Sequence, residues 1–457
     1  MRLCPVIALL TAAACAPVQQ VQVSKNTALD NSAGLSRPAI QAFAGTTGTP
    51  PLKSNTEIAK DFLDLEFRME SGRTIPVLSR FEGPITVALT GDVPATAPAE
   101  LARLIQRFRS EAGLDISTAA STANASVTIE FRPRAQLQRV VPTAACFVVP
   151  RVRSFAEYKA ARNGPAVDWT NMTTRQNVAI FVPSDTNPQE VRDCLHEELA
   201  QAMGPLNDLY RLPDSVFNDD NFNTVLTGFD MLILRMHYAP ELYSGMTEAE
   251  TARHLPAILA RLNPAGAGIG GTAAQLSPRA WTTSVEAAFG PRGSVGSRTS
   301  AAQRMLSIAK AHGWRDSRLA FSYYALGRTQ VARDPQAAVA AFAEAGRIYR
   351  SLSGAHIHAA HVDMQLAALA LSSGQAEQAI GFADRAIPVV QRAENAALLA
   401  TLMLIKAEAL DSLGQAAEAK ALRLDSLGWA RYGFGSEQHV RARMSEIAAL
   451  GARGRNG

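Results

Sequence analysis

The sequence predicts a multidomain protein, in which an α+β domain over residues 53–250 precedes an all-α helical-repeat domain over residues 299–450. Three observations support this prediction. The 457 residues exceed what one ordinary hydrophobic core accommodates. The first part mixes runs of β-branched residues with amphipathic helical patterns, whereas the second is rich in alanine and repeats every 40 or 41 residues. A helical and glycine-rich connector over residues 251–298 separates them, and residues 451–457 form a tail.

The first fourteen residues have the pattern of an export signal. Arg2 precedes an apolar run over residues 3–10 that is too short to span a bilayer. The stretch TAAAC at residues 11–15 resembles a bacterial lipobox, which implies that Cys15 is lipidated. We therefore expect an exported, periplasmic protein anchored by lipid at the outer membrane, with ordinary signal-peptidase cleavage as the alternative. Residues 15–52 are rich in small and polar residues, which predicts a flexible tether.

The remaining cysteines predict one disulfide. Cys4 lies in the export signal, so Cys146 and Cys194 are left as a pair in an oxidising compartment. A bridge between them would close a loop of about 49 residues and stabilise the fold by about 4 kcal/mol in the chain-entropy model. Two separate buried thiols are the alternative.

The α+β part predicts strands where β-branched residues cluster and a helix at residues 97–113, which ends at Gly113. A second helix begins at residue 188, with Asn187 as its cap and Glu190 as the partner in a capping box. The predicted strands cover residues 84–91, 125–133, 146–152 and 177–183.

Small residues recur at matching positions along the helical part of the chain. Turn glycines at Gly374 and Gly414 share this register. The pattern resembles tetratricopeptide repeats, which implies stacked helix hairpins that bind protein or peptide partners. A helical bundle without a binding groove is the alternative. The recurring positions are Ala338, Phe342 and Ala345, then Ala379, Ala383 and Ala386, then Ala419, Arg423 and Ser426.

The charge of the chain gives no support for electrostatic partners. The net charge is only +4, and the basic residues are scattered among alanines. We therefore expect no nucleic acid and no membrane contact other than the lipid anchor.

The stretch HEELAQAMGPLND at residues 196–208 has the spacing of a zinc-protease helix with other residues at the ligand positions. In H-E-x-x-H-x-x-G-x-x-H, three histidines bind zinc and the glutamate polarises the bound water. His196 fails as the first ligand, because residue 200 is alanine. A shift of one residue restores every spacing. The motif positions are then held by Glu197, Glu198, Gln201, Gly204 and Asn207.

This register resembles a matrixin-like metzincin, a zincin whose ligand helix is followed by a methionine turn and a closing helix. DSVFND at residues 214–219 matches the turn, with Phe217 in place of methionine, and residues 226–238 match the closing helix, which opens at Thr227 with Asp230. The stretches EGPITV, ACFVVPR and CLHEELAQAMG also resemble an uncharacterised family of exported bacterial proteins, a domain of unknown function. That resemblance implies a fold and no established activity.

The resemblance implies a degenerate metal site. Glu197 is an acceptable ligand, whereas the amide oxygens of Gln201 and Asn207 suit calcium or manganese better than zinc. Asp208 is the alternative third ligand. We expect no cofactor, with zinc or another divalent cation as the alternative, and Glu198 would be the general base if the site were active. In a metal-free site Glu197, Gln201 and Asn207 would hydrogen-bond one another.

Three other features receive structural interpretations. His196 is expected to be a surface or supporting residue. Residues 219–230 place oxygen-bearing side chains as in a calcium loop but lack glycine at the sixth position. His358 and His361 are expected to be neighbours on a helix surface.

The sequence as a whole favours an envelope lipoprotein with a degenerate, non-catalytic metzincin-like domain and a helical-repeat domain that bind protein or peptide partners. An active metallopeptidase with an atypical ligand set is one alternative. A purely structural zincin-like domain, with all binding in the repeats, is the other.

Overall fold

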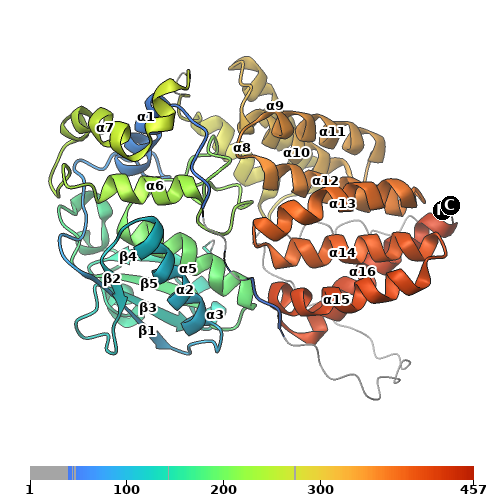
Figure 1. The fold of residues 1–457 in the computed structure, drawn as a ribbon, viewed down its shortest axis with the longest axis horizontal. Coiled ribbons are helices and arrows are strands. Elements are labelled where there is room, and N and C mark those ends of the chain that lie inside the picture. Colours follow the sequence, from blue (N-terminus) through green and yellow to red (C-terminus); the bar gives the residue numbers. More distant parts are fainter. Residues whose placement is uncertain (1–39, 44, 46–47, 143, 272–273, 457) are drawn as a thin grey trace.

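The computed structural model describes residues 40–456 except residues 44, 46–47, 143 and 272–273 (Figure 1). The predicted export signal and Cys15 lie outside these residues. An α/β domain with a mixed sheet is followed by a region built only of helices, which confirms the broad fold class. Within the described residues, no helix combines the length and apolar character that a membrane span requires.

The sheet of the first domain has five strands in the order β2-β1-β3-β5-β4. Neighbouring strands are parallel except for β4, which runs antiparallel to β5 at one edge. All residues of β5 are buried, as expected for a parallel strand covered on both faces. Four strands fall within the predicted ranges, and β2 was not predicted. The strands are β1 Ile85–Gly91, β2 Ile116–Thr118, β3 Val127–Arg132, β4 Phe147–Pro150 and β5 Val178–Pro183.

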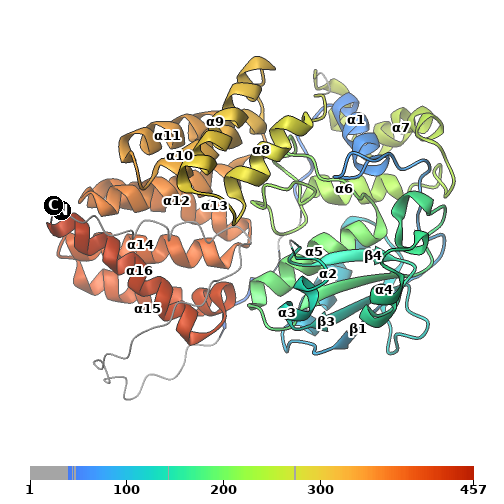
Figure 2. The same cartoon turned by 180° about the vertical axis from the view of Figure 1, so that it is seen from behind.

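Helices cover both faces of this sheet (Figures 1 and 2). On one face of the sheet, α2 and α5 pack against each other, and both share the main hydrophobic core with α1 and α6. On the opposite face, Leu137 of α3 and Phe155 of α4 pack against Phe181 of β5. Helix α7 packs on α1 and crosses the expected domain boundary at residue 250. The helices are α1 Asn55–Glu66, α2 Ala97–Glu111, α3 Arg134–Gln138, α4 Phe155–Ala161, α5 Pro188–Met203, α6 Gly228–His237 and α7 Glu248–Leu262, with short 3-10 turns at Pro165–Val167, Trp169–Asn171 and Pro264–Gly268.

Helix α5 begins with the predicted cap. The Asn187 side chain accepts a hydrogen bond from the Glu190 backbone N–H at 2.8 Å. The predicted capping box does not form, because the Glu190 carboxylate instead binds the side chains of Thr186 and Arg134. The Glu190 carboxylate therefore connects α5 to α3 and does not cap the first turn of α5.

The buried end of α5 is capped by groups from other elements. The guanidinium of Arg175 donates to the carbonyls of Gln201 and Ala202, each at 2.7 Å, and the Tyr238 hydroxyl donates to the Met203 carbonyl at 2.9 Å. These bonds satisfy carbonyls that a helix end leaves open and place a cation at its negative end. Gly204 ends the helix at φ −143°, so the left-handed turn of the metzincin motif is not formed.

A disulfide joins Cys146, next to β4, with Cys194 in the middle of α5, and their Cα atoms lie 6.0 Å apart. The bridge therefore fixes the antiparallel edge strand to the helix that carries the candidate motif.

The second part consists of helix pairs at a regular interval. Hairpins α10/α11, α12/α13 and α14/α15 follow one another, and Gly374 and Gly414 occupy left-handed turns at φ +76° and +79°. The recurring small residues are buried between helices, whereas Arg423 is half-buried and pairs with Glu408. These helices are α8 Arg279–Phe289, α9 Val295–Ala311, α10 Ser317–Gln330, α11 Pro335–Ser351, α12 His356–Ser372, α13 Ala376–Arg392, α14 Ala396–Ser412, α15 Ala416–Phe434 and α16 Glu437–Asn456.

The two parts share a core. Tyr210 and Phe222, from the segment between α5 and α6, belong to the hydrophobic core of the helical region. The Phe222 ring stacks on His361 at 4.4 Å and meets His358 edge-on at 4.8 Å. Both histidines are buried, so their predicted surface location is wrong. A helix pattern alone does not reveal which face another domain covers.

Polar contacts extend this interface along the first half of α5. The Gln189 side chain donates to Asn395 and accepts from the Ala397 backbone N–H, and Arg192 donates to the Glu394 carbonyl at 2.7 Å. The turn between α13 and α14 is therefore bound directly to the helix that carries the candidate motif.

The described end of the predicted tether also contacts the folded parts. Phe43 stacks on Trp429 of α15 at 4.5 Å, and the Gly48 backbone N–H donates to Glu111 at 2.9 Å. A Cβ added at Gly228 would lie 1.9 Å from the Thr49 carbonyl oxygen, so this approach requires glycine. Three residues from the C-terminal end of the predicted tether, Phe43, Gly48 and Thr49, therefore contact the folded parts.

Removal of the disulfide is expected to lower stability. The Cys146→Ala/Cys194→Ala double variant should lose about 4 kcal/mol of unfolding free energy in urea, because its unfolded chain regains the entropy of an open loop. Dithiothreitol should lower the free energy of unfolding of the wild type to nearly that of the variant and should leave that of the variant unchanged. Equal stability of the oxidised wild type and the variant would contradict this assignment.

Candidate functional site

The motif residues of α5 lie largely inside the protein. Glu198 and Gln201 are buried, and Glu197 is half-buried. Asn207 is also buried, but its amide nitrogen donates to the Asp64 carbonyl of α1 at 2.8 Å. Among the described residues, no hydrogen bond joins Glu197, Gln201 and Asn207, so the expected mutual bonding of these residues is wrong. Asn207 instead fixes the returning chain to α1.

Asp208 meets two further carboxylates, Asp219 from the start of the calcium-like stretch and Glu70, which the sequence did not indicate. One oxygen from each of Glu70, Asp208 and Asp219 lies within 4.8 Å of the others, a spacing compatible with ligands around a cation. Asp208 is half-buried, whereas Glu70 and Asp219 are exposed. Glu70 follows α1 and lies in no recognisable motif. We call Glu70, Asp208 and Asp219, with the adjoining Glu197 and Glu198, the carboxylate cluster.

Mutual repulsion and burial raise the pKa values of four members of the cluster, Glu197, Glu198, Asp208 and Asp219. The pKa of Glu197 is raised to about 8, mainly by burial and then by the charges of Asp219 and Glu70. Burial and the neighbouring carboxylates raise the pKa values of Glu198 and Asp208 well above their ordinary range. The pKa of Asp219 is raised to about 7, because protein atoms reduce the hydration of its carboxyl group and Glu70 repels it.

These pKa values bear on the expected role of Glu198. A general base must be ionised at the working pH, and the raised pKa of Glu198 disfavours its ionised form. Within the described residues, no lysine or arginine forms an ion pair with any member of the carboxylate cluster. The arrangement therefore suits cation binding better than proton abstraction.

The segment between α5 and α6 is held by buried polar contacts. Arg211 donates to Asp61 at 2.9 Å and to Asp64 at 2.8 Å, and all three residues are buried. The Tyr210 hydroxyl donates to Asp219 at 3.3 Å. The pKa of Tyr210 is raised by burial and by the nearby carboxylates, so this hydroxyl remains a donor. The contacts place Asp208 and Asp219 on the same side of the segment.

The stretch that matches the methionine turn supports the start of α6. Phe217 is fully buried, and its carbonyl accepts from the Leu209 backbone N–H at 2.9 Å. Thr227 and Asp230 form the predicted capping box. The Ser215 hydroxyl donates to Asp230 at 2.5 Å, which joins the turn to the helix.

His196 and the calcium-like stretch have structural roles. His196 is buried, and its Nδ1 accepts from the Leu226 backbone N–H at 3.1 Å, so a surface position is excluded and a supporting one is found. Burial and nearby arginines lower its pKa well below the ordinary range. Residues 219–230 do not surround one point, because Asp220 binds His358 at 2.8 Å while Asp230 caps α6.

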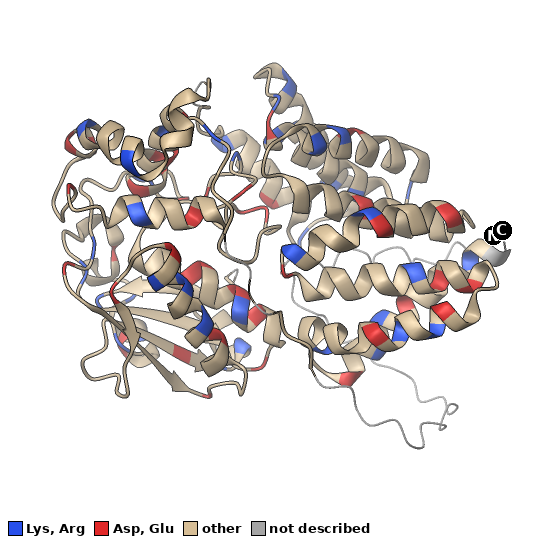
Figure 3. Cartoon of the chain, viewed as in Figure 1, with Lys and Arg blue, Asp and Glu red and all other residues tan. Residues whose placement is uncertain are grey.

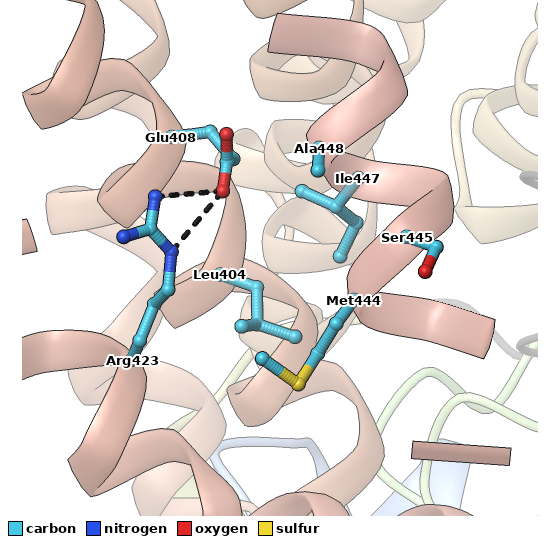
Figure 4. Close-up of a pocket in the computed structure, with 7 residues that line it drawn as sticks. All are labelled: Leu404, Glu408, Arg423, Met444, Ser445, Ile447 and Ala448. Atoms are coloured by element: carbon cyan, nitrogen blue, oxygen red, sulfur yellow. Dashed lines mark hydrogen bonds and ion pairs between the residues drawn. The ribbon is translucent and has the colours of Figure 1, made fainter. Parts of the chain in front are cut away.

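A separate pocket of about 210 Å³ lies between α14, α15 and α16 (Figure 4). Leu404, Met444 and Ile447 make it largely apolar, and the ion pair between Arg423 and Glu408 forms its rim. Figure 3 shows acidic and basic residues interspersed along both parts of the molecule. The pocket and the carboxylate cluster are therefore separate candidates of different chemical character.

Residues 55–257 match the family model described as "Protein of unknown function (DUF2927)". The chain contains a DUF2927 domain. This domain runs from the start of α1 into α7 and includes the entire carboxylate cluster, whereas the helical region lies outside it. No curated protein and no solved structure matches the chain. The uncharacterised family expected from the sequence is therefore supported, and it brings no activity with it.

Neutralising Glu198 is expected to stabilise the chelator-treated protein. At pH 8 the free energy of unfolding of the Glu198→Gln variant should be about 1–3 kcal/mol higher than that of the wild type, because the substitution removes a buried carboxylate without a hydrogen-bond partner. The pKa of Glu198 in the folded state lies above its unfolded-state value of about 4.3. Glu198 therefore lowers the free energy of unfolding progressively as the pH rises above about 4.3. The difference should nearly vanish at pH 4.5.

Urea unfolding at both pH values measures this effect, with the exposed Glu418→Gln variant as the control. A Glu198→Gln variant that is less stable than the wild type at pH 8 would contradict the electrostatic interpretation.

Proposed function

We propose that this chain is an exported envelope lipoprotein whose DUF2927 domain is a zincin-like scaffold without zinc catalysis, and whose tetratricopeptide-like helical region binds protein or peptide partners. The observation that carries the non-catalytic part is the composition of the ligand positions. They hold Glu197, Gln201 and Asn207, and Asn207 is bound to the Asp64 carbonyl. Three imidazoles bind zinc and activate water, whereas this set does neither efficiently.

The order of elements supports the zincin-like scaffold. A largely parallel sheet precedes α5, and the antiparallel strand β4 lies at its edge. After α5 the chain turns back at Asn207, passes through the turn around Phe217 and enters α6, in the order that the resemblance implies. Tyr238 at the end of α6 binds the end of α5, so the closing helix supports the helix that carries the motif.

The regular helix pairs and their pocket support partner binding. Repeated hairpins expose an extended surface that accommodates peptide segments. The pocket at Leu404, Met444 and Ile447 has the size and apolar lining to take one large apolar side chain of a partner. The Glu408–Arg423 pair at the rim offers polar groups to the flanking peptide backbone.

Filling the pocket is expected to remove peptide binding. Peptides selected from a displayed library on the full chain should bind the wild type, and Ala448→Phe should weaken them at least tenfold, because the new ring occupies the pocket. Ala123→Phe, at an exposed loop position of the DUF2927 domain, is the matched control.

The same preparations should show no zinc-dependent peptide hydrolysis. Hydrolysis that Glu198→Gln abolishes would overturn the non-catalytic assignment.

The lipid anchor has its own test. In cells that export the chain, Cys15→Ala should move it from the membrane fraction to the soluble periplasmic fraction, because the acyl acceptor is lost. Cys4→Ala, which leaves the lipobox-like stretch intact, should remain in the membrane fraction. Unchanged fractionation of the Cys15 variant would exclude the anchor.

A further inference from the structure

The geometry points to a binding site for one hard divalent cation, calcium in particular, at the carboxylate cluster where the DUF2927 domain meets the helical region. Glu70, Asp208 and Asp219 supply three carboxylate oxygens within 4.8 Å of one another. Calcium binds oxygens at about 2.4 Å, so two ligands on opposite sides of the ion lie about 4.8 Å apart. The three groups can therefore ligate one ion without a large rearrangement.

Glu198 provides an independent indication of a missing positive charge. Its side chain is 5% exposed, and its Oε2 atom is buried without a hydrogen-bond partner among the described residues. The charges of Glu197 and Glu70 both act on this carboxyl group, which couples it electrostatically to two other members of the carboxylate cluster. Asp208 Oδ1 is likewise buried without a partner. Buried carboxylate oxygens in native proteins are normally paired or bound to a metal.

The cations nearest in the chain are already engaged elsewhere. Arg211 follows Asp208 closely, yet its guanidinium binds Asp61 and Asp64 on α1. Arg192 lies one turn before Glu197 and binds Asp193 and the Glu394 carbonyl. Within the part of the chain that the structure describes, no basic side chain pairs with the carboxylate cluster, and a bound cation would supply that charge.

The ligand chemistry selects the class of ion. All five members of the cluster are aspartate or glutamate, so it offers carboxylate oxygens as ligands. Zinc favours nitrogen and sulfur ligands, whereas calcium takes six to eight oxygens in flexible geometry. Glu70 and Asp219 are exposed, so water can complete the coordination. Magnesium demands a more regular octahedron and binds such a site less well.

A cation here would also act on the domain interface. Asp219 precedes Asp220, which binds His358 of α12, and Tyr210 joins Asp219 to the core of the helical region. Glu70 belongs to the segment after α1. One ion would therefore connect this segment with the loop that docks into the helical region. This site is independent of the proposed peptide pocket.

The test uses the full chain after chelator treatment, with calcium, magnesium or zinc chloride as the only added ligand. Isothermal titration should show one calcium per chain with a Kd on the order of 0.1 mM, in the range of extracellular calcium modules. Calcium should raise the melting temperature. Asp208→Asn and Asp219→Asn should each weaken calcium binding at least tenfold, and the exposed Asp92→Asn should leave it unchanged.

Folding of the variants is checked in chelator alone, where loss of a repelling carboxylate should leave their melting temperatures at or above that of the wild type. Terbium luminescence, excited through Tyr210 and Trp281, provides a second readout, because the Tyr210 hydroxyl binds Asp219 and the Trp281 ring lies 5.0 Å from the Tyr210 ring. Calcium should displace terbium from the wild type. Absence of calcium binding, equal binding by Asp208→Asn, or tighter binding of zinc than of calcium to the cluster would each overturn the proposal.

Discussion

The buried ion pairs of Arg211 with Asp61 and Asp64 fix the segment on which both the candidate site and the domain interface depend. The chain between α5 and α6 has no regular helix or strand, although much of it is buried. Such a segment has to satisfy its polar groups through specific side chains. Arg211 ties it to α1, and removal of the guanidinium would leave Asp61 and Asp64 with only their ion pairs to Lys53 and Lys60, so that the segment would lose its link to α1.

Acidic and basic residues are distributed unevenly around the same segment. Its α1 side holds carboxylates with a matching arginine, whereas its α5 side gathers Glu197, Asp208 and Asp219 without a basic partner among the described residues. Neutral side chains would pack in this partly buried arrangement at lower cost than carboxylates. The retained acidic groups are therefore the feature of the DUF2927 domain that most needs a functional explanation.

The sequence predicted helix caps and strands, because these features depend on residues that are close together in the chain. Asn187 caps α5 and Thr227 forms a capping box with Asp230, because caps involve residues three apart in the chain. The strands likewise follow their β-branched runs. The site was predicted only in part, because Glu70 comes from a distant segment that carries no motif. The burial of His358 and His361 was missed for the same kind of reason, since a loop of the other domain covers that helix face.

The insertion of Tyr210 and Phe222 into the helical core has a consequence for how such chains can evolve. The family boundary near residue 257 marks where sequence similarity ends, but the physical core crosses it. A recombination event that joined this DUF2927 domain to an unrelated partner would leave two large aromatic side chains facing water. The two halves are therefore physically coupled: a change in the surface that receives Phe222 requires a matching change in the loop that carries it.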